Sequence, residues 1–150
     1  MSAYVGFEGY QTKSGFIHKE LCIYYDENDY DHFIFKKPEW EVSEKDMKSV
    51  RYCCTQLNGL KFNDGSVPYN EIETILKKIE NHQIYTFSDI AVKTLKKYLP
   101  NCSKIKNIQD LGFEMPTILP FSNCFRAKHR PRYCAKAKAK EVKEFMRWVD

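Results

Sequence analysis

The amino-acid sequence predicts an α/β fold, a mixed sheet of about five strands with helices on its faces. Two features of the chain predict this class. Residues 3–35 read as three β-strands joined by short turns, which form an antiparallel meander. After residue 43 the chain alternates between helical and strand-like segments, as in sheets whose faces are covered by helices. With 150 residues and 43% hydrophobic content, the chain suits a single domain over residues 1–150.

The meander begins with the β-rich residues 3–10, which end at a glycine turn, and continues with a strand over residues 16–25. Side chains alternate between the two faces of a strand. We therefore expect one face to carry Ile17, Lys19, Leu21, Ile23 and Tyr25, and the other His18, Glu20, Cys22 and Tyr24. Residues 32–35 form the third strand, which ends before Pro38.

The second half of the chain carries helix signals. Ser43 begins a helix, and Pro68 opens another over residues 69–80. Residues 84–87 form a strand, after which Ser88 caps a helix that ends at Pro100. We expect a short strand at residues 105–108 and a final helix over residues 133–149. The sequence shows no repeat, low-complexity tract or domain boundary.

Composition limits the classes of function. No apolar run is long enough for a membrane helix, and the amino terminus lacks a signal-peptide pattern. The six cysteines, two of them adjacent at Cys53 and Cys54, do not resemble a disulfide framework. We therefore expect an intracellular protein, cytoplasmic or nuclear, without membrane association. The net charge of +4 permits a nucleic-acid partner without requiring one.

A cluster of metal-binding residue types lies before the final helix. Cys124, His129 and Cys134 place two thiols and an imidazole within eleven residues, and these groups are zinc ligands. A fourth ligand has to come from elsewhere, and Glu20 is the candidate. The alternative is two buried free cysteines and a surface histidine, because the spacing lacks the close Cys-x2-Cys pairs of a zinc finger.

The order β-β-β-α-β-α-β-α, with an early carboxylate and a late histidine, resembles the ribonuclease H-like (RNase H-like) nucleases, in particular the DEDDh-type exonucleases. Their Asp-x-Glu motif corresponds here to Gly6-Phe7-Glu8, and their His-x4-Asp motif to His129 through Cys134. Glycine and cysteine therefore replace two acids. Two-metal chemistry needs several hard carboxylate ligands, so the resemblance implies that the usual exonuclease reaction is lost. The alternative is an active nuclease, with Glu8, Glu20, Asp110 and His129 as its catalytic residues.

The chain is more similar to the Maelstrom domain of the piRNA pathway, in which a zinc-binding Glu-Cys-His-Cys set replaces the catalytic residues. The similarity, shared with a set of invertebrate proteins, rests on Lys19-Glu20-Leu21-Cys22-Ile23, Asp31-His-Phe-Ile34, Cys124, His129 and Cys134-Ala135. It implies a structural zinc held by Glu20, Cys124, His129 and Cys134, with Cys22 or His18 as substitutes for Glu20. A site with four protein ligands has no open position for water. The resemblance also implies single-stranded RNA binding, as an adaptor in small-RNA or transposon silencing.

Basic residues gather near the carboxyl end. Lys136, Lys140, Lys143 and Arg147 recur at helical spacing, and Arg126, Lys128, Arg130 and Arg132 precede them. Such charge binds phosphates, and neighbouring aromatics can stack on unpaired bases. The resemblance to the Maelstrom domain implies that single-stranded RNA is the partner. A solvated helix face is the alternative. A third hypothesis is a protein-interaction module around Tyr52, Phe62 and Tyr69. The sequence gives no indication of the oligomeric state.

Overall fold

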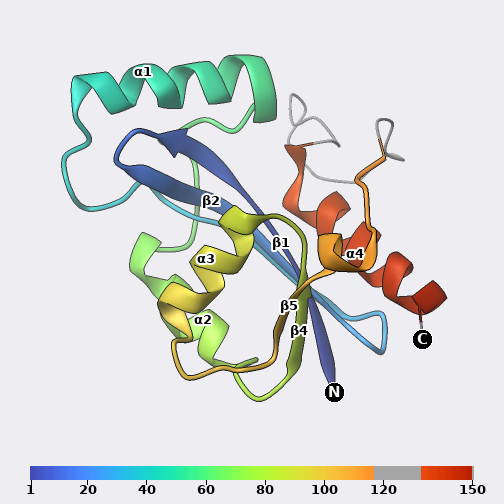
Figure 1. Ribbon diagram of the computed structural model, residues 1–150. Coiled ribbons are helices and arrows are strands. Elements are labelled where there is room, and N and C mark those ends of the chain that lie inside the picture. The colour runs from blue at the N-terminus through green and yellow to red at the C-terminus, as the bar shows by residue number, and fades with distance from the viewer. Residues whose placement is uncertain (117–132, 150) are drawn as a thin grey trace.

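The computed structural model describes residues 1–116 and 133–149, which form one mixed sheet with helices packed against it (Figure 1). The strands are β1 (Ser2–Thr12), β2 (Gly15–Tyr25), β3 (Tyr30–Ile34), β4 (Gln83–Thr86) and β5 (Ile105–Asn107). Their order in the sheet is β3-β2-β1-β4-β5, so the first strand occupies the centre. β1, β2 and β3 pair antiparallel, while β4 pairs parallel to β1 and β5 parallel to β4. The predicted α/β class and the mixed five-stranded sheet are confirmed.

The helices begin and end largely where the sequence signals indicate. They are α1 (Glu44–Tyr52), α2 (Ile72–Lys77), α3 (Asp89–Tyr98) and α4 (Ala135–Val149). The side chains of Ser43 and Ser88 accept hydrogen bonds from the first turns of α1 and α3, as N-caps do. The helix predicted over residues 69–80 is shorter, since its first turn, Tyr69–Glu71, is a 3₁₀ helix. A π-helix, Cys53–Asn58, continues α1 and ends at Gly59 in the left-handed conformation.

The sheet separates two hydrophobic layers. On one face Val5 and Leu21 pack with Leu76 of α2 and Leu95 of α3 in the main core. On the other face α4 covers the sheet, where its Val142 and Met146 join Tyr4, Ile108 and Phe113. Figure 1 shows α2 and α3 on the side of the sheet opposite α4. β1 therefore contributes to both layers, because alternate side chains of a strand face opposite sides.

A β-bulge interrupts the alternation predicted for residues 16–25. Glu8 pairs with Glu20, but the next residue, Gly9, pairs with His18, so Lys19 is the additional residue. The prediction that His18 shares a face with Glu20 is wrong for this reason. The His18 ring stacks on Tyr69 in the main core, with 3.8 Å between ring centroids.

In residues 1–116 and 133–149, no helix is long and apolar enough to cross a membrane.

Candidate functional site

The final helix lies directly on the central strand at Gly6. A Cβ atom placed on Gly6 would lie 2.3 Å from the carbonyl oxygen of Ala135 and 2.8 Å from the amide nitrogen of Ala139. These are helix backbone atoms, so no side chain could move aside to make room. Ala135 and Ala139 are themselves small and fully buried, which lets the helix approach the strand. Position 6, which corresponds to the first acid of the nuclease motif, therefore has no space for any side chain.

Glu20 anchors the beginning of α4 from the middle of β2. Its side chain is fully buried, and its Oε1 accepts a 2.7 Å hydrogen bond from the backbone nitrogen of Ala135. Its Oε2 lies at hydrogen-bond distance from Nε2 of His32 on β3 and 3.9 Å from Sγ of Cys134. The first amides of a helix have no partner within the helix and carry partial positive charge. The Glu20 carboxylate thus serves as an N-terminal cap supplied by a distant strand.

Glu8 is the cross-strand neighbour of Glu20 and also points toward α4. It is buried on β1 and forms an ion pair with Lys138 of α4. Burial raises the pKa of Glu8 above its ordinary value, although the nearby Lys138 ammonium lowers it. Each of the two adjacent carboxylates is therefore engaged by groups of the same helix.

Two thiols complete this buried group. Cys134 and Cys22 are fully buried, and Cys22 packs beneath Ala135 and Ala139. Burial raises the pKa of the Cys22 thiol, and the Glu20 charge raises it further. We call Glu8, Glu20, Cys22, His32, Cys134 and Lys138 the polar cluster.

A small cavity of about 190 Å³ lies beside the polar cluster. Glu8 and Lys138 line it together with Phe87 and Ser88, which follow β4. In open α/β sheets, ligands bind outside the carboxyl ends of the parallel strands, and this cavity has that location. The Glu8–Lys138 ion pair therefore forms part of the wall of this cavity.

The structure brings together some of the predicted site residues. Glu20 and Cys134, two of the four predicted zinc ligands, are in contact. Cys124 and His129 lie outside the described residues, as do Arg126, Lys128, Arg130 and Arg132. Cys22 lies close enough to Glu20 to feel its charge, whereas His18 belongs to the main core and does not approach Glu20.

Only two of the three acids predicted for an active nuclease lie close together. Glu8 and Glu20 are paired across β1 and β2. Asp110 is exposed on the 3₁₀ helix Ile108–Leu111, which follows β5, and β4 separates β5 from β1. The third carboxylate therefore does not join the other two.

Two members of the polar cluster, His32 and Lys138, were not predicted to be site residues. His32 pairs with Cys22 across β2 and β3, which places its ring beside Glu20. The register of the hairpin could have indicated this contact, because residues two apart on a strand share a face. Lys138 was not singled out because helix spacing alone does not show which lysine points toward the sheet.

The donor types of the polar cluster fit zinc, and one pair also fits its geometry. In a tetrahedral site a zinc-bound sulfur and a zinc-bound oxygen lie roughly 3.6 Å apart. The 3.9 Å between Cys134 Sγ and Glu20 Oε2 is close to that separation. Within residues 1–116 and 133–149, no three His, Cys, Asp or Glu side chains are arranged to hold a metal ion. The described part of the chain thus supplies one suitable pair of ligands, Glu20 and Cys134.

The basic ridge predicted along α4 is interrupted. Lys140 and Arg147 are exposed, and Lys136 lies over the Tyr30 ring at 4.4 Å from its centroid. Lys143 instead is buried and donates hydrogen bonds to the Tyr25 carbonyl at 2.6 Å and to Asn28 Oδ1 at 2.9 Å. Lys143 therefore ties α4 to the turn between β2 and β3 and is not part of an exposed surface.

The aromatic residues predicted for protein docking do not form one exposed surface. Tyr52 is exposed, whereas Tyr69 is buried and Phe62 packs edge-on against the buried Tyr10.

Comparison with known proteins finds no family model, no curated protein and no solved structure that matches this chain.

Proposed function

We propose that this chain is a catalytically degenerate RNase H-like domain that binds single-stranded RNA. The order of its elements and the central position of β1, with β4 joined parallel to it, support the resemblance to that fold. One observation carries the proposed loss of catalysis. The backbone of α4 covers Gly6, and the same helix engages Glu20 and Glu8.

Two-metal phosphoryl transfer needs carboxylate oxygens that are free to hold two cations about 4 Å apart. Glu20 uses both oxygens, one for the Ala135 amide and the other for His32 and Cys134. Glu8 is neutralised by Lys138, and Asp110 lies beyond β5. The acids thus hold the final helix on the sheet instead of presenting a site for a pair of magnesium ions.

The proposal includes a structural zinc held by Glu20, Cys124, His129 and Cys134. Support comes from the contact between Glu20 and Cys134 and from the chemistry of the four donors. Such a zinc would supply folding free energy and would join the sheet to the segment that precedes α4.

RNA binding is proposed for the basic carboxyl-terminal region. Lys136, Lys140 and Arg147 are at least partly accessible on α4, and Arg126, Lys128, Arg130 and Arg132 precede that helix in the sequence. Contacts between lysine or arginine and phosphate release counterions, so the affinity should fall as salt is added. A role in small-RNA silencing and contacts with protein partners remain predictions of the resemblance.

The RNA-binding proposal is tested with a fluorescent single-stranded RNA of twelve nucleotides, titrated at 50 and 200 mM salt. Joint replacement of Lys140 and Arg147 by alanine should weaken binding several-fold and lower the salt dependence by one to two phosphate contacts, about one for each cation removed. Lys77 and Lys78 at the end of α2 are also exposed, and their joint replacement provides a control matched in charge. Equal effects of the two double variants, or no binding at 50 mM salt, would overturn the proposal.

The loss of catalysis is tested with labelled RNA and DNA in magnesium and in manganese. We expect the wild-type chain and Glu8→Gln to give the same result, with no cleavage above background in either. Cleavage that disappears in Glu8→Gln would instead establish the active nuclease.

A further inference from the structure

A larger cavity, of about 470 Å³, lies between the tip of the β1–β2 hairpin, Trp40 and helix α3. It adjoins the small cavity beside the polar cluster, since Gln11, Phe16 and Ile90 line both. Small-molecule sites typically have volumes of about 300–1,000 Å³, so this cavity has the size of a ligand site.

Trp40 gives the cavity an accessible aromatic surface. Its side chain is 55% exposed, yet its ring packs perpendicular to the Tyr69 ring with 5.1 Å between centroids. Tyr69 in turn stacks on the buried His18. Trp40 is therefore supported by the buried Tyr69–His18 pair, while part of its ring remains open to solvent. Exposed aromatics of this kind provide stacking surfaces for nucleic-acid bases.

Asp46 of α1 supplies a buried acceptor in the same cavity. The residue is only 7% exposed and lines the cavity. Its backbone N–H donates a hydrogen bond to Ser43 Oγ, but among the described residues no donor lies within hydrogen-bond or ion-pair distance of its carboxylate. An unpaired polar group in a buried position costs free energy. A ligand that brings hydrogen-bond donors would remove that cost.

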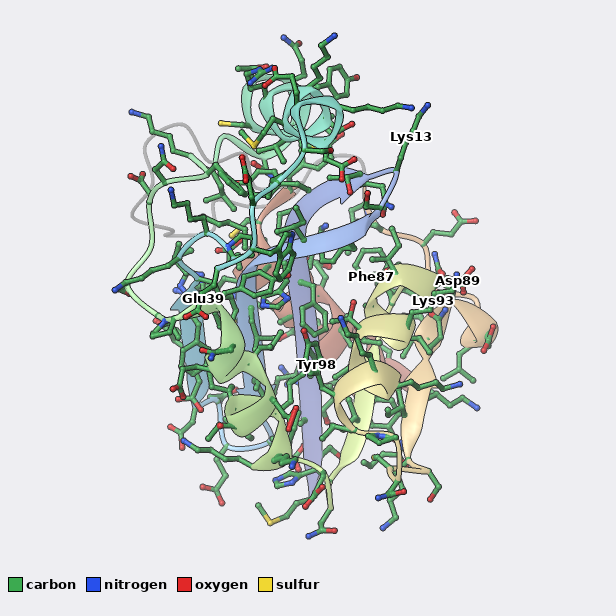
Figure 2. The ribbon with its side chains drawn as sticks, turned by 90° about the vertical axis from the view of Figure 1, so that its left-hand side faces the viewer. Lys13, Glu39, Phe87, Asp89, Lys93 and Tyr98 are labelled. Carbon is green, nitrogen blue, oxygen red and sulfur yellow. The ribbon has the colours of Figure 1, made fainter. Side chains whose placement is uncertain are left out.

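Lys93 and Lys97 add positive charge on one side of the cavity. They lie one turn apart on α3, and both are exposed and line the cavity. Figure 2 shows Lys93 near the upper part of α3 and Tyr98 near its lower end. The Lys97 Nζ lies 5.2 Å from the centroid of the Tyr98 ring. Lys96, on the same helix, does not line the cavity.

We propose that this cavity binds a single nucleotide whose base donates hydrogen bonds to Asp46, with guanine as the preferred base. The base would stack on Trp40, and the phosphate would be held by Lys93 and Lys97. Guanine presents two neighbouring donors, N1–H and the N2 amino group, which match the two oxygens of a carboxylate. Uracil presents one donor, N3–H, flanked by two carbonyl oxygens. The carboxylate oxygens of Asp46 would repel these carbonyl oxygens. The choice of a nucleotide rests on the proposed function, because an RNA-binding chain is expected to hold bases as well as phosphates.

Other ligands use fewer of these groups. Inorganic phosphate would be attracted by the two lysines but would leave Asp46 unpaired. A cationic side chain would suit Asp46 and Trp40 but would be repelled by Lys93 and Lys97. A nucleotide combines an aromatic ring, donors and an anion, so it uses all four residues.

The test uses the Trp148→Phe variant of the whole chain. The chain contains two tryptophans, and Trp148 is 88% exposed near the end of α4, so this variant leaves Trp40 as the only tryptophan. We expect GMP to quench Trp40 fluorescence in a saturable manner and UMP to bind at least tenfold more weakly. Sites built around a hydrogen bond reject ligands that cannot make it.

Further replacements in this background assign the roles. Asp46→Asn should reduce the preference for GMP over UMP, and joint replacement of Lys93 and Lys97 by alanine should weaken both nucleotides. Asp89→Asn and Lys96→Ala are the matched controls, because both residues are exposed and do not line the cavity. Thermal unfolding of each variant shows whether the fold is retained.

The outcomes separate this inference from the proposed function. If the twelve-nucleotide RNA binds but GMP and UMP quench equally, or if Asp46→Asn keeps the preference, the nucleotide site is wrong and RNA binding stands. If GMP quenches selectively but the RNA does not bind, the site stands and the RNA-binding proposal is wrong. An absence of saturable quenching by GMP also overturns the site.

Discussion

At the scale of single residues, Gly6 determines how closely the final helix approaches the sheet. The predicted effect of Gly6→Ala is a loss of about 3 kcal/mol in the free energy of unfolding, since the new methyl group meets the backbone of Ala135 and Ala139. Urea unfolding monitored by circular dichroism measures this loss. Because the clash is with backbone atoms, adding Ala139→Gly should not restore stability. Rescue by that second change would contradict the explanation.

His18 makes the fold less stable at acidic pH. The pKa of His18 is lowered from 6.5 to about 4. Burial is the main cause, the hydrogen bond to the Tyr69 carbonyl acts in the opposite direction, and the nearby Lys97 charge also lowers the pKa. The unfolded chain therefore binds more protons than the folded chain between these pH values. The part of the free energy of unfolding that depends on neutral His18 is fully present above pH 6.5 and is lost as the pH falls toward 4.

The expected loss that is due to His18 is about 2–3 kcal/mol between pH 7 and pH 4.5, at about 1.4 kcal/mol per pKa unit. Comparing urea unfolding of the wild type and His18→Phe at both pH values isolates this contribution from that of the carboxylates. Equal pH dependence in the two proteins would show that His18 does not titrate in this way.

At the scale of secondary-structure elements, α4 depends on a cap that lies 115 residues away in the sequence. Glu20→Ala should lower the free energy of unfolding by about 2–4 kcal/mol, because it removes the cap of Ala135 and one partner of the partly buried His32. Glu20→Gln should cost less, since its amide oxygen can still accept from Ala135. Thermal melts of the two variants measure the difference, and equal losses would argue against capping.

The elements were predictable where a local pattern determines them. The strands of the meander follow from alternation, and the starts of α1 and α3 follow from Ser43 and Ser88. The bulge at Lys19 was not predictable, because it depends on the pairing of β2 with β1. For the same reason the position of His18 was wrong. The helix predicted from residue 133 begins at Ala135, where Glu20 supplies the cap.

At the scale of the whole molecule, the proposed zinc would contribute to global stability. The chain purified without chelator should contain about one zinc per molecule. Free zinc at a hundred times its dissociation constant should stabilise the fold by about 2.7 kcal/mol. Elemental analysis and thermal melts with and without chelator check both statements. Cys134→Ser should abolish the metal and the effect of the chelator, whereas Cys102→Ser, outside the polar cluster, should preserve them; a metal-free wild type unaffected by chelator would contradict the proposal.

The candidate site was predictable only in part. The sequence named Glu20 and Cys134 as candidate zinc ligands, and the fold brings these two side chains into contact. His32 and Lys138 required the register of β2 with β3 and the orientation of α4, neither of which the sequence states directly. The cavity around Trp40 joins a loop, two helices and a hairpin, and only the fold brings them together.

Docking of α4 on the strand at the centre of the sheet has a consequence for synthesis. A ribosome makes β1 well before α4, so the nascent sheet keeps one face uncovered, with Glu8 and Glu20 hydrated, until α4 emerges. Contacts between such distant parts of a chain slow folding. A message cut short before the codons of α4 would therefore yield a polypeptide with an unshielded apolar face, a substrate for chaperones and proteases.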